Sequence, residues 1–344
     1  MRRLLILTLC STSLALALGM WRMQAPATLL PADGQHVPAE WLKEARKALT
    51  PLADRRPPDQ TFLTYPEWFL VFSPAEQADY FQQHTATTFP YVTHTRQIWE
   101  SYRAVVNEMG DAFPPNPGYH LMIWVIGVSS TVEYLVKSGY EAVVGRLTDT
   151  SQSLSAEDQL NAAEMERYVA FIKDRPWYEF DFSTSLTRLW RDTPFWGSYP
   201  IRKLERRYWL TSEWIVKYGY GKLIGVGTGQ VYEAALPTTV VLNQQDSLQQ
   251  FPRYDRFVGA ANAHINNGGS FHEIAGNSTV ILVCAVVDEK TAFQPSRARL
   301  LFQQPVPTMP GQFRVLWGIP VQELHILLQE AGAAGIAIEH IFDF

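Results

Sequence analysis

The segment GYHLMIWVIGVSSTVEYLVKSGYEAVVGRL, residues 118 to 147, is apolar at its start and carries Glu133, Lys137 and Glu141 in its second half. The prolines of PPNPG, residues 114 to 118, end the preceding element, and the uninterrupted stretch after them predicts one long helix. Charged residues spaced by four share one face of a helix, so Lys137 can pair with a glutamate on either side.

These three charges decide between a membrane span and a helix of a globular domain. A charged side chain near the middle of a bilayer costs about 2.5 to 3.5 kcal/mol, whereas a charged stripe on a polar face costs little. We therefore predict that the helix belongs to a folded domain, with Glu133 and Lys137 as binding residues at the edge of a cavity. A second membrane span is the alternative.

A second long helix is expected in the segment from residue 205 to residue 236. Gly221, Gly225 and Gly229 recur there at every fourth position, a spacing that lets another helix approach closely. We predict that these three are helix-packing residues and that their partner is the helix at 118 to 147. The same glycine cluster also permits a phosphate-binding loop, but the strand that a dinucleotide fingerprint requires does not precede it.

Residues 61 to 249 as a whole are predicted to form a mainly helical, aromatic-rich domain. The run from Thr61 to Phe72 reads as an extended segment. Ser73, with Glu76 three residues later, reads as a capping box that opens a helix. A further helix is expected from about His94 to Met109, where apolar residues recur at helical spacing.

Three proline-bounded loops of this domain combine aromatic rings with carboxylates: YPEW at 65 to 68, PWYEFDF at 176 to 182 and TPFWGSYP at 193 to 200. Aromatic rings stack on sugars, and carboxylates act as acid and base in glycoside hydrolysis. The residues that a glycan site would use are Trp177 and Tyr178 for binding, and Glu67, Glu179 and Asp181 for catalysis. The alternative is that the rings only seal the ends of helices.

From residue 250 to residue 344 the pattern changes to short apolar strands. FVGAANAHINNGGSFHEIAG, residues 257 to 276, reads as two strands around an Asn-Gly turn. Three further strands, a helix and a closing strand follow. This order predicts a small α+β sandwich of ferredoxin-like or similar type, which makes the whole chain α+β. We expect a protein partner or a second copy of the chain to bind through this domain.

Residues 1 to 22 have the pattern of a signal anchor or signal peptide, with two arginines before an apolar run from Leu4 to Trp21. A run of this length just spans a bilayer. Residues 23 to 60 follow as a proline-rich tether with one short helix. The sequence thus predicts a bacterial inner-membrane protein, held through its N-terminal segment, with its main domain in the periplasm. The alternative is a periplasmic or secreted protein after signal cleavage.

Composition argues against several classes of protein. The 29 basic and 34 acidic residues are spread without a basic cluster, which argues against a nucleic-acid partner. The two cysteines form no C-x-x-C pair, and the histidines lack the spacing of a chelating pair. We therefore predict no metal and no cofactor.

Together these features favour a membrane-anchored, exported binding or scaffold protein of a bacterial envelope, part of a larger complex, over an enzyme. Two alternatives remain. One is an exported enzyme that acts on glycans or lipids through carboxylates in the aromatic loops. The other is a multi-span membrane subunit in which the helices at 119 to 147 and 207 to 236 both insert.

Overall fold

The computed structural model describes residues 36–43, 48–57, 59–150, 153–231, 238–243, 247–291 and 293–343, with the backbone alone for 227–231. The predicted anchor at 1 to 22 lies outside the described residues. So do residues 44 to 47, which fall in the short helix expected in the tether. The described part of the tether contains one 3-10 turn, η1, Leu52–Asp54.

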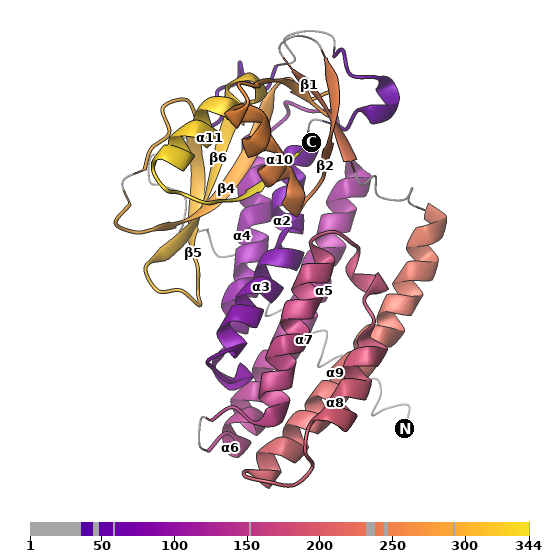
Figure 1. The fold of residues 1–344 in the computed structure, drawn as a ribbon. Helices are drawn as coiled ribbons and strands as arrows, with labels where there is room; N and C mark the ends of the chain where they lie inside the picture. The colour runs from indigo at the N-terminus through magenta and orange to yellow at the C-terminus, as the bar shows by residue number, and fades with distance from the viewer. Residues whose placement is uncertain are drawn as a thin grey trace.

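The helical half is an elongated bundle that extends away from the sheets (Figure 1). One helix is continuous from Pro117 to Thr148, because a π-helical turn, Glu141–Gly145, joins α5 to α6. The helices are α2 (Gln60–Glu67), α3 (Phe69–Phe81), α4 (Tyr91–Met109), α5 (Pro117–Tyr140), α6 (Arg146–Thr148), α7 (Ala156–Ile172), α8 (Phe182–Asp192) and α9 (Pro200–Val231).

The extended segment predicted from Thr61 to Phe72 is wrong, because this stretch forms α2 and the start of α3. Every residue from Thr61 to Pro66 is buried. A run that is buried on all sides has no polar face, so its periodicity does not distinguish a strand from a helix. The capping box is also wrong: Ser73 lies inside α3, and its hydroxyl hydrogen-bonds His94 Nδ1 and the Tyr134 hydroxyl.

The second half confirms the α+β class, with two antiparallel sheets and two helices. The three-stranded sheet has the order β2-β1-β3 and the four-stranded sheet the order β5-β6-β4-β7. The elements are β1 (Thr238–Asn243), β2 (Leu248–Pro252), α10 (Asp255–Asn266), β3 (Phe271–Ile274), β4 (Val280–Asp288), β5 (Arg299–Pro305), β6 (Gln312–Pro320), α11 (Leu324–Ala333) and β7 (Ile338–Ile341). The domain boundary expected between residues 249 and 250 falls inside β2.

One of the two strands expected around the Asn-Gly turn is instead the helix α10. Phe257, Ala261 and Ile265 recur at helical spacing and are buried against the sheet. Gly268, with a φ of +79°, follows the end of the helix, where left-handed glycine is common. His264 is therefore a helix residue, whereas Glu273 lies in the strand β3.

The two halves of the chain share one core. Alternate residues of β4 point to opposite sides of the sheet. Leu282 and Cys284 pack with Phe62 and Phe69 of the helical half. Ile281 and Val283 pack on the other side, with α10 and α11. The four-stranded sheet is thus covered by helices of the bundle on one face and by α10 and α11 on the other.

Candidate functional site

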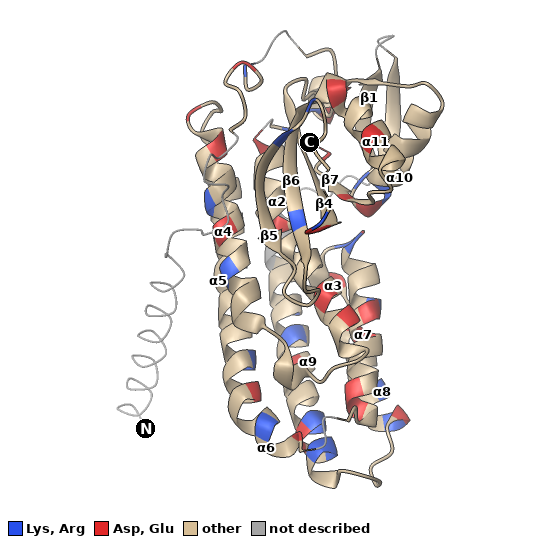
Figure 2. Ribbon diagram, turned by 90° about the vertical axis from the view of Figure 1, so that its left-hand side faces the viewer, with Lys and Arg blue, Asp and Glu red and all other residues tan. Residues whose placement is uncertain are grey.

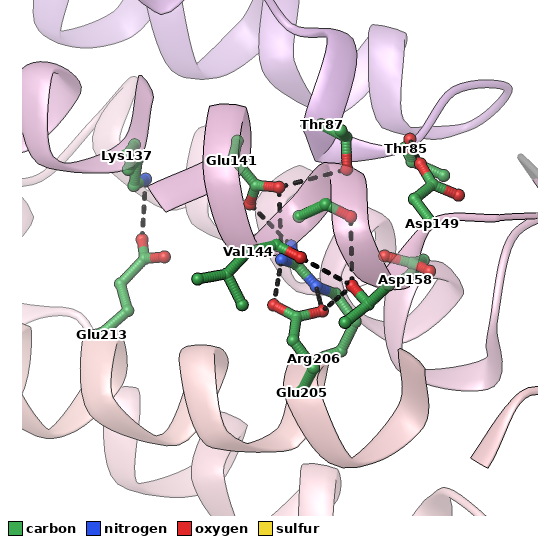
Figure 3. A network of polar contacts seen from close by, with 12 residues as sticks. Thr85, Thr87, Lys137, Glu141, Val144, Asp149, Asp158, Glu205, Arg206 and Glu213 are labelled. Carbon is green, nitrogen blue, oxygen red and sulfur yellow. Dashed lines mark hydrogen bonds and ion pairs between the residues drawn. The ribbon is translucent and has the colours of Figure 1, made fainter. Parts of the chain in front are cut away.

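Four charged residues form a closed ring of ion pairs between α5 and α9. Lys137 Nζ lies 2.9 Å from Glu133 Oε1 and 2.8 Å from Glu213 Oε1. Lys217 Nζ lies 3.1 Å and 2.9 Å from the same two oxygens. We call Glu133, Lys137, Glu213 and Lys217 the ion-pair quartet. Figure 3 shows Lys137 and Glu213 facing each other from the two helices.

The pairing shows that α5 and α9 are antiparallel. Glu133 meets Lys217, Lys137 meets Glu213, and further along α5, Glu141 meets Arg206. Later residues of one helix therefore contact earlier residues of the other. Each lysine contacts both glutamates. A twofold rotation that exchanges α5 with α9 therefore leaves the pattern of contacts in the quartet unchanged.

The four groups of the quartet stabilise one another in their charged forms. Burial alone would raise the pKa of Glu133, but Lys137 and Lys217 outweigh it and lower the pKa to about 2. Burial alone would lower the pKa of Lys137, but Glu133 and Glu213 raise it above its usual value. The same balance lowers the pKa of Glu213 and raises that of Lys217. All four groups are therefore charged at neutral pH, and the quartet has no net charge.

Glu141, expected to pair with Lys137, pairs with Arg206 instead. Its Oε1 lies 2.7 Å from Arg206 Nη1, and Thr87 donates a hydrogen bond to its Oε2 (Figure 3). Glu205 also contacts Arg206. More buried pairs follow toward the end of the bundle remote from the sheets, where charged residues gather around α6 and α8 (Figure 2). These are Arg202 with Asp158 and Arg207 with Glu157.

A cavity of about 50 Å³ lies beside the quartet, between α3, α5, α7 and α9. Gln77 and Tyr134 line it together with Glu133, Lys137 and Lys217. Gln77 Nε2 donates to the Tyr134 hydroxyl, while its Oε1 is buried and accepts no hydrogen bond within the described chain. The space and the polar groups suit an internal water.

Polar contacts continue from this cavity to the four-stranded sheet. His94 Nε2 lies 3.4 Å from Glu76 Oε2, and Arg314 Nη1 lies 2.9 Å from Glu76 Oε1. Burial and the nearby Arg314 lower the pKa of His94 to about 3, so the imidazole is neutral. In order, the contacting residues are Tyr134, Ser73, His94, Glu76, Arg314 and Glu339.

The three carboxylates proposed for catalysis occupy different settings. Glu67 accepts a hydrogen bond of 2.5 Å from the Tyr119 hydroxyl, and burial raises its pKa. Glu179 is exposed on the 3-10 turn η4, Trp177–Glu179. Asp181 caps α8 by accepting from the amides of residues 183 and 184, and hydrogen bonds with these two residues lower its pKa to about 2. In the described part of the chain no interaction joins Glu67 to the other two.

The predicted binding aromatics and the helix-packing glycines meet each other. Trp177 stacks on Tyr220, with ring centroids 5.6 Å apart. A Cβ at Gly221 would lie 3.2 Å from the Tyr178 carbonyl oxygen, and one at Gly225 would lie 3.5 Å from the Tyr178 ring. These two glycines therefore make room for η4, whereas ion pairs join α5 to α9. The neighbours of Gly229 fall outside the described side chains.

The outward faces of α5 and α9 are apolar. We call these residues the apolar flank; their side chains are between 39% and 72% exposed. Along the continuous helix the Glu133 side chain is 38% exposed, and the next exposed charged residue is Arg146 of α6. The flank consists of Leu121, Trp124, Val125, Val132 and Val136 of α5, Val143 of the π-helical turn that follows it, and Ile201, Leu204, Tyr208, Ile215, Val216 and Leu223 of α9.

The other outer faces of the bundle are mainly polar, with Val92 of α4 and Trp190 of α8 as exposed apolar residues. Exposed residues include Arg96 and Asn107 on α4, Gln159 and Glu166 on α7, and Ser183 on α8. The two kinds of face differ because α5 and α9 turn most of their charged residues inward; Lys222 of α9 is an exposed exception. Lys137 is 5% exposed and Arg206 2% exposed, while Val136 beside Lys137 is 57% exposed.

Among the described residues one helix, Pro117–Thr148, is long and apolar enough to cross a membrane. Only 22% of its apolar window is buried within the protein. A core helix of a soluble protein with the same composition would be mostly buried.

The quartet has a sequence signal that the analysis of single helices missed. TVEYLVKSGYEAVVGRLT, residues 131 to 148, and TSEWIVKYGYGKLIGVGT, residues 211 to 228, align without gaps. Each segment supplies one glutamate and one lysine four residues later. The identical pairs are Thr131 and Thr211, Glu133 and Glu213, Val136 and Val216, Lys137 and Lys217, Gly139 and Gly219, Tyr140 and Tyr220, Gly145 and Gly225, and Thr148 and Thr228.

Comparison of the chain with protein-family models, with curated proteins and with solved structures finds no match. The site must therefore be interpreted from its own chemistry: a neutral, buried ring of charges inside the bundle, and an apolar surface over the two helices that carry it.

Proposed function

We propose that the protein is a membrane-bound binding or scaffold protein of a bacterial envelope. In this proposal the N-terminal segment anchors the chain to the inner membrane, and the apolar flank lies on the periplasmic surface of the same bilayer. The observation that supports the proposal is the flank itself, an apolar surface over α5 and α9 of a bundle whose other outer faces are mainly polar. Helices of this kind lie in the interface of a bilayer, with their apolar faces toward the acyl chains.

The orientation follows from the distribution of polar residues around the bundle. If the bundle crossed the bilayer, the exposed Gln159, Glu166 and Arg96 would meet lipid along with the flank. If it lies flat, these residues stay in water and only the flank is covered. From Leu121 to Val143 the flank on α5 is about 33 Å long at 1.5 Å per residue, so a large contact area is available.

A multi-span subunit is the second candidate, and one observation favours it. Lys137, Glu141 and Arg206 point inward and are paired, which is the arrangement of ionisable residues in membrane bundles. In that case other membrane helices would have to cover the polar faces of α4, α7 and α8.

We do not extend the proposal to catalysis, because Glu67 and Asp181 are engaged in structural hydrogen bonds and Glu179 does not meet Glu67. We further propose that the partner or second copy binds through the C-terminal half, in a ferredoxin-like arrangement. The order β5-β6-β4-β7 with antiparallel neighbours supports this arrangement.

Fluorescent labels on single cysteines of the full chain test the orientation. With Cys10 and Cys284 replaced, a polarity-sensitive dye is attached at Val136→Cys and Val216→Cys on the flank. Val92→Cys on α4, an exposed valine outside the flank, is the matched control. In liposomes the flank labels should shift to the blue and be quenched by nitroxide lipids, while the control label stays in water.

The same experiment separates the two candidates. A label at Ser183→Cys, on the polar face of α8, should remain in water if the bundle lies flat and should be quenched by lipid if the bundle spans the bilayer. Flank labels that stay fully water-exposed in liposomes would refute both.

A further inference from the structure

A second and larger cavity, of about 630 Å³, lies far from the quartet, beneath the segment that precedes α2. We call residues 36–43 and 48–57 the arm and this space the arm cavity. Its other walls are the loop between α4 and α5, residues 112 to 114, and the turn between β3 and β4, residues 276 to 279. The volume is in the range of small-molecule sites, about 300 to 1,000 Å³.

The arm is held against the rest of the protein on both sides of this cavity. At one end, the Val37 amide donates to Glu108 Oε2 at 3.0 Å. At the other end, the amides of Leu49 and Thr50 and the Thr50 hydroxyl all donate to the buried carboxylate of Glu273. A carboxylate that accepts three hydrogen bonds from one segment fixes that segment firmly, so these contacts define the wall of the cavity.

Arg55 adds a third attachment within the arm. Its Nε donates to the Thr50 carbonyl oxygen at 2.7 Å, and its Nη2 donates to the Ala48 carbonyl oxygen at 2.8 Å. The aliphatic part of the same side chain packs over Gly276, where an added Cβ would lie 2.7 Å from Arg55 Cγ. Arg55 therefore shapes the wall and has two of its donors occupied.

In the part of the chain that the structure describes, the charged groups that line the arm cavity all have one sign. Its described charged residues are Lys43, Arg55 and Arg56. Among the residues that the structure describes, no carboxylate lies within ion-pair distance of Lys43 or Arg56. Lys43 is exposed, and Arg56 acts on the buried Asp343 only from beyond ion-pair distance. Two cations at the edge of a cavity favour an anionic ligand.

The remaining lining is mostly apolar. Leu42, Phe113 and Pro114 contribute side-chain surface, and three alanines leave room. The Ser278 hydroxyl, in the turn that closes the cavity, is buried without a hydrogen-bond partner in the described chain. Cations, an unpaired hydroxyl and an apolar wall together match a molecule with a charged end and a hydrocarbon body.

We propose that the arm cavity binds an acyl amphiphile with one anionic headgroup, such as a fatty acid or an anionic membrane lipid. The headgroup lies against Lys43 and Arg56, and the acyl chain lies over Leu42 and Phe113. The site is separate from the apolar flank and does not depend on it. In this proposal the protein binds a small ligand in the arm cavity and the bilayer through the apolar flank.

Titration of a dansyl-labelled fatty acid into the full chain in phosphatidylcholine nanodiscs tests the proposal. Wild type should bind saturably, and the methyl ester of the same probe, which has no charge, should bind at least about ten-fold more weakly, as expected for the loss of charged hydrogen bonds. Lys43→Glu with Arg56→Glu should cause a similar loss. Lys290→Glu with Arg297→Glu, two exposed cations elsewhere, is the charge-matched control and should bind as wild type does.

A second variant tests the space and leaves the charges in place. Ala112→Trp fills the cavity from an exposed position of the α4–α5 loop and should also abolish saturable binding, with an unchanged melting temperature. Absence of saturable binding to wild type, equal binding of acid and ester, or full binding by either cavity variant would overturn the proposal.

Two further measurements identify the source of the ligand and separate this site from the flank. Palmitate competes with the probe if the ligand is a free fatty acid, and phosphatidylglycerol in the nanodisc competes if it is a membrane lipid. Failure of both to compete with the probe would overturn the proposal. Val136→Glu on the flank should weaken contact with the bilayer and leave probe binding unchanged, whereas the cavity variants should do the opposite.

Discussion

Removal of Lys137 is the most direct test of the ion-pair quartet. The Lys137 side chain is buried and bridges Glu133 and Glu213 at 2.9 Å and 2.8 Å. Removing one member of a buried ion pair costs about 3 to 5 kcal/mol, because the partner charge is left without compensation. Lys217 would still hold both carboxylates, and Glu133 is 38% exposed and partly screened by water. We therefore expect Lys137→Met to lower the free energy of unfolding by about 3 kcal/mol, the lower end of that range.

A double substitution isolates the charge effect from the loss of packing. Lys137→Met with Glu213→Leu leaves one neutral pair, Glu133 with Lys217 at 3.1 Å. Replacing buried ion pairs with apolar groups of similar size is often close to neutral, so the double variant should recover at least about 2 kcal/mol relative to the single one. Urea titrations followed by tryptophan fluorescence measure these differences. Lys222→Met, at an exposed lysine of α9, is the control and should change stability by less than about 0.5 kcal/mol.

A loss of less than about 1 kcal/mol for Lys137→Met, as for an exposed pair, would contradict the buried ring of ion pairs. So would a double variant as unstable as the sum of the two single variants, because the charges would then not be coupled.

Two other predictions concern positions outside the quartet. Gly221→Leu should lower the free energy of unfolding by about 1 to 3 kcal/mol through overpacking, since even a Cβ would lie 3.2 Å from the Tyr178 carbonyl oxygen. Gly219→Leu, where a Cβ has nothing within 4 Å, is the control and should not destabilise. Equal melting temperatures of the two variants would contradict this. Burial raises the pKa of Asp343 from 3.8 to about 6 despite Arg253. The contribution of the neutral Asp343 side chain to the free energy of unfolding is therefore complete below pH 3.8 and is lost as the pH rises through about 6. Asp343→Asn should therefore remove a fall in unfolding free energy over this interval, and an unchanged pH slope in urea titrations would count against it.

Periodic elements of the fold could be predicted from the sequence. The helices expected at 94 to 109 and 118 to 147 are present as α4 and as α5 with its continuation into α6. The first of the three strands expected after residue 276 is present as β4. These segments have a clear helical period or a short apolar run between turn residues. The segments 61 to 72 and 255 to 266 were misassigned because burial or a nearby Asn-Gly pair obscured their period.

The candidate site could be predicted only in part. The contact between Glu133 and Lys137 follows from their spacing on one helix. The partners Glu213 and Lys217 lie on another helix, and the pattern of one helix does not identify its neighbour. The repeat of residues 131 to 148 at 211 to 228 carries that information, since two copies of one charge pattern can complement each other when antiparallel.

The outward position of the apolar residues on α5 was not predictable from composition. An apolar helix with a charged stripe can bury either side, and tertiary pairing decides which. Here the charged stripe finds opposite charges on α9, and this pairing leaves Val132 and Val136 exposed.

The contact between α2 and the end of the described chain bears on the order in which the protein can fold. Thr61 Oγ1 donates to the Phe342 carbonyl oxygen at 3.2 Å and accepts from the Leu282 amide at 2.9 Å. Tyr65 and Phe342 pack with their ring centroids 5.5 Å apart. A growing chain therefore exposes the apolar side of α2 until β4 and β7 have been synthesised, and contacts so distant in sequence form slowly. In the export that we propose, the chain crosses a narrow translocon unfolded, and a core that closes only when β7 has been synthesised would keep the polypeptide in that state during the passage.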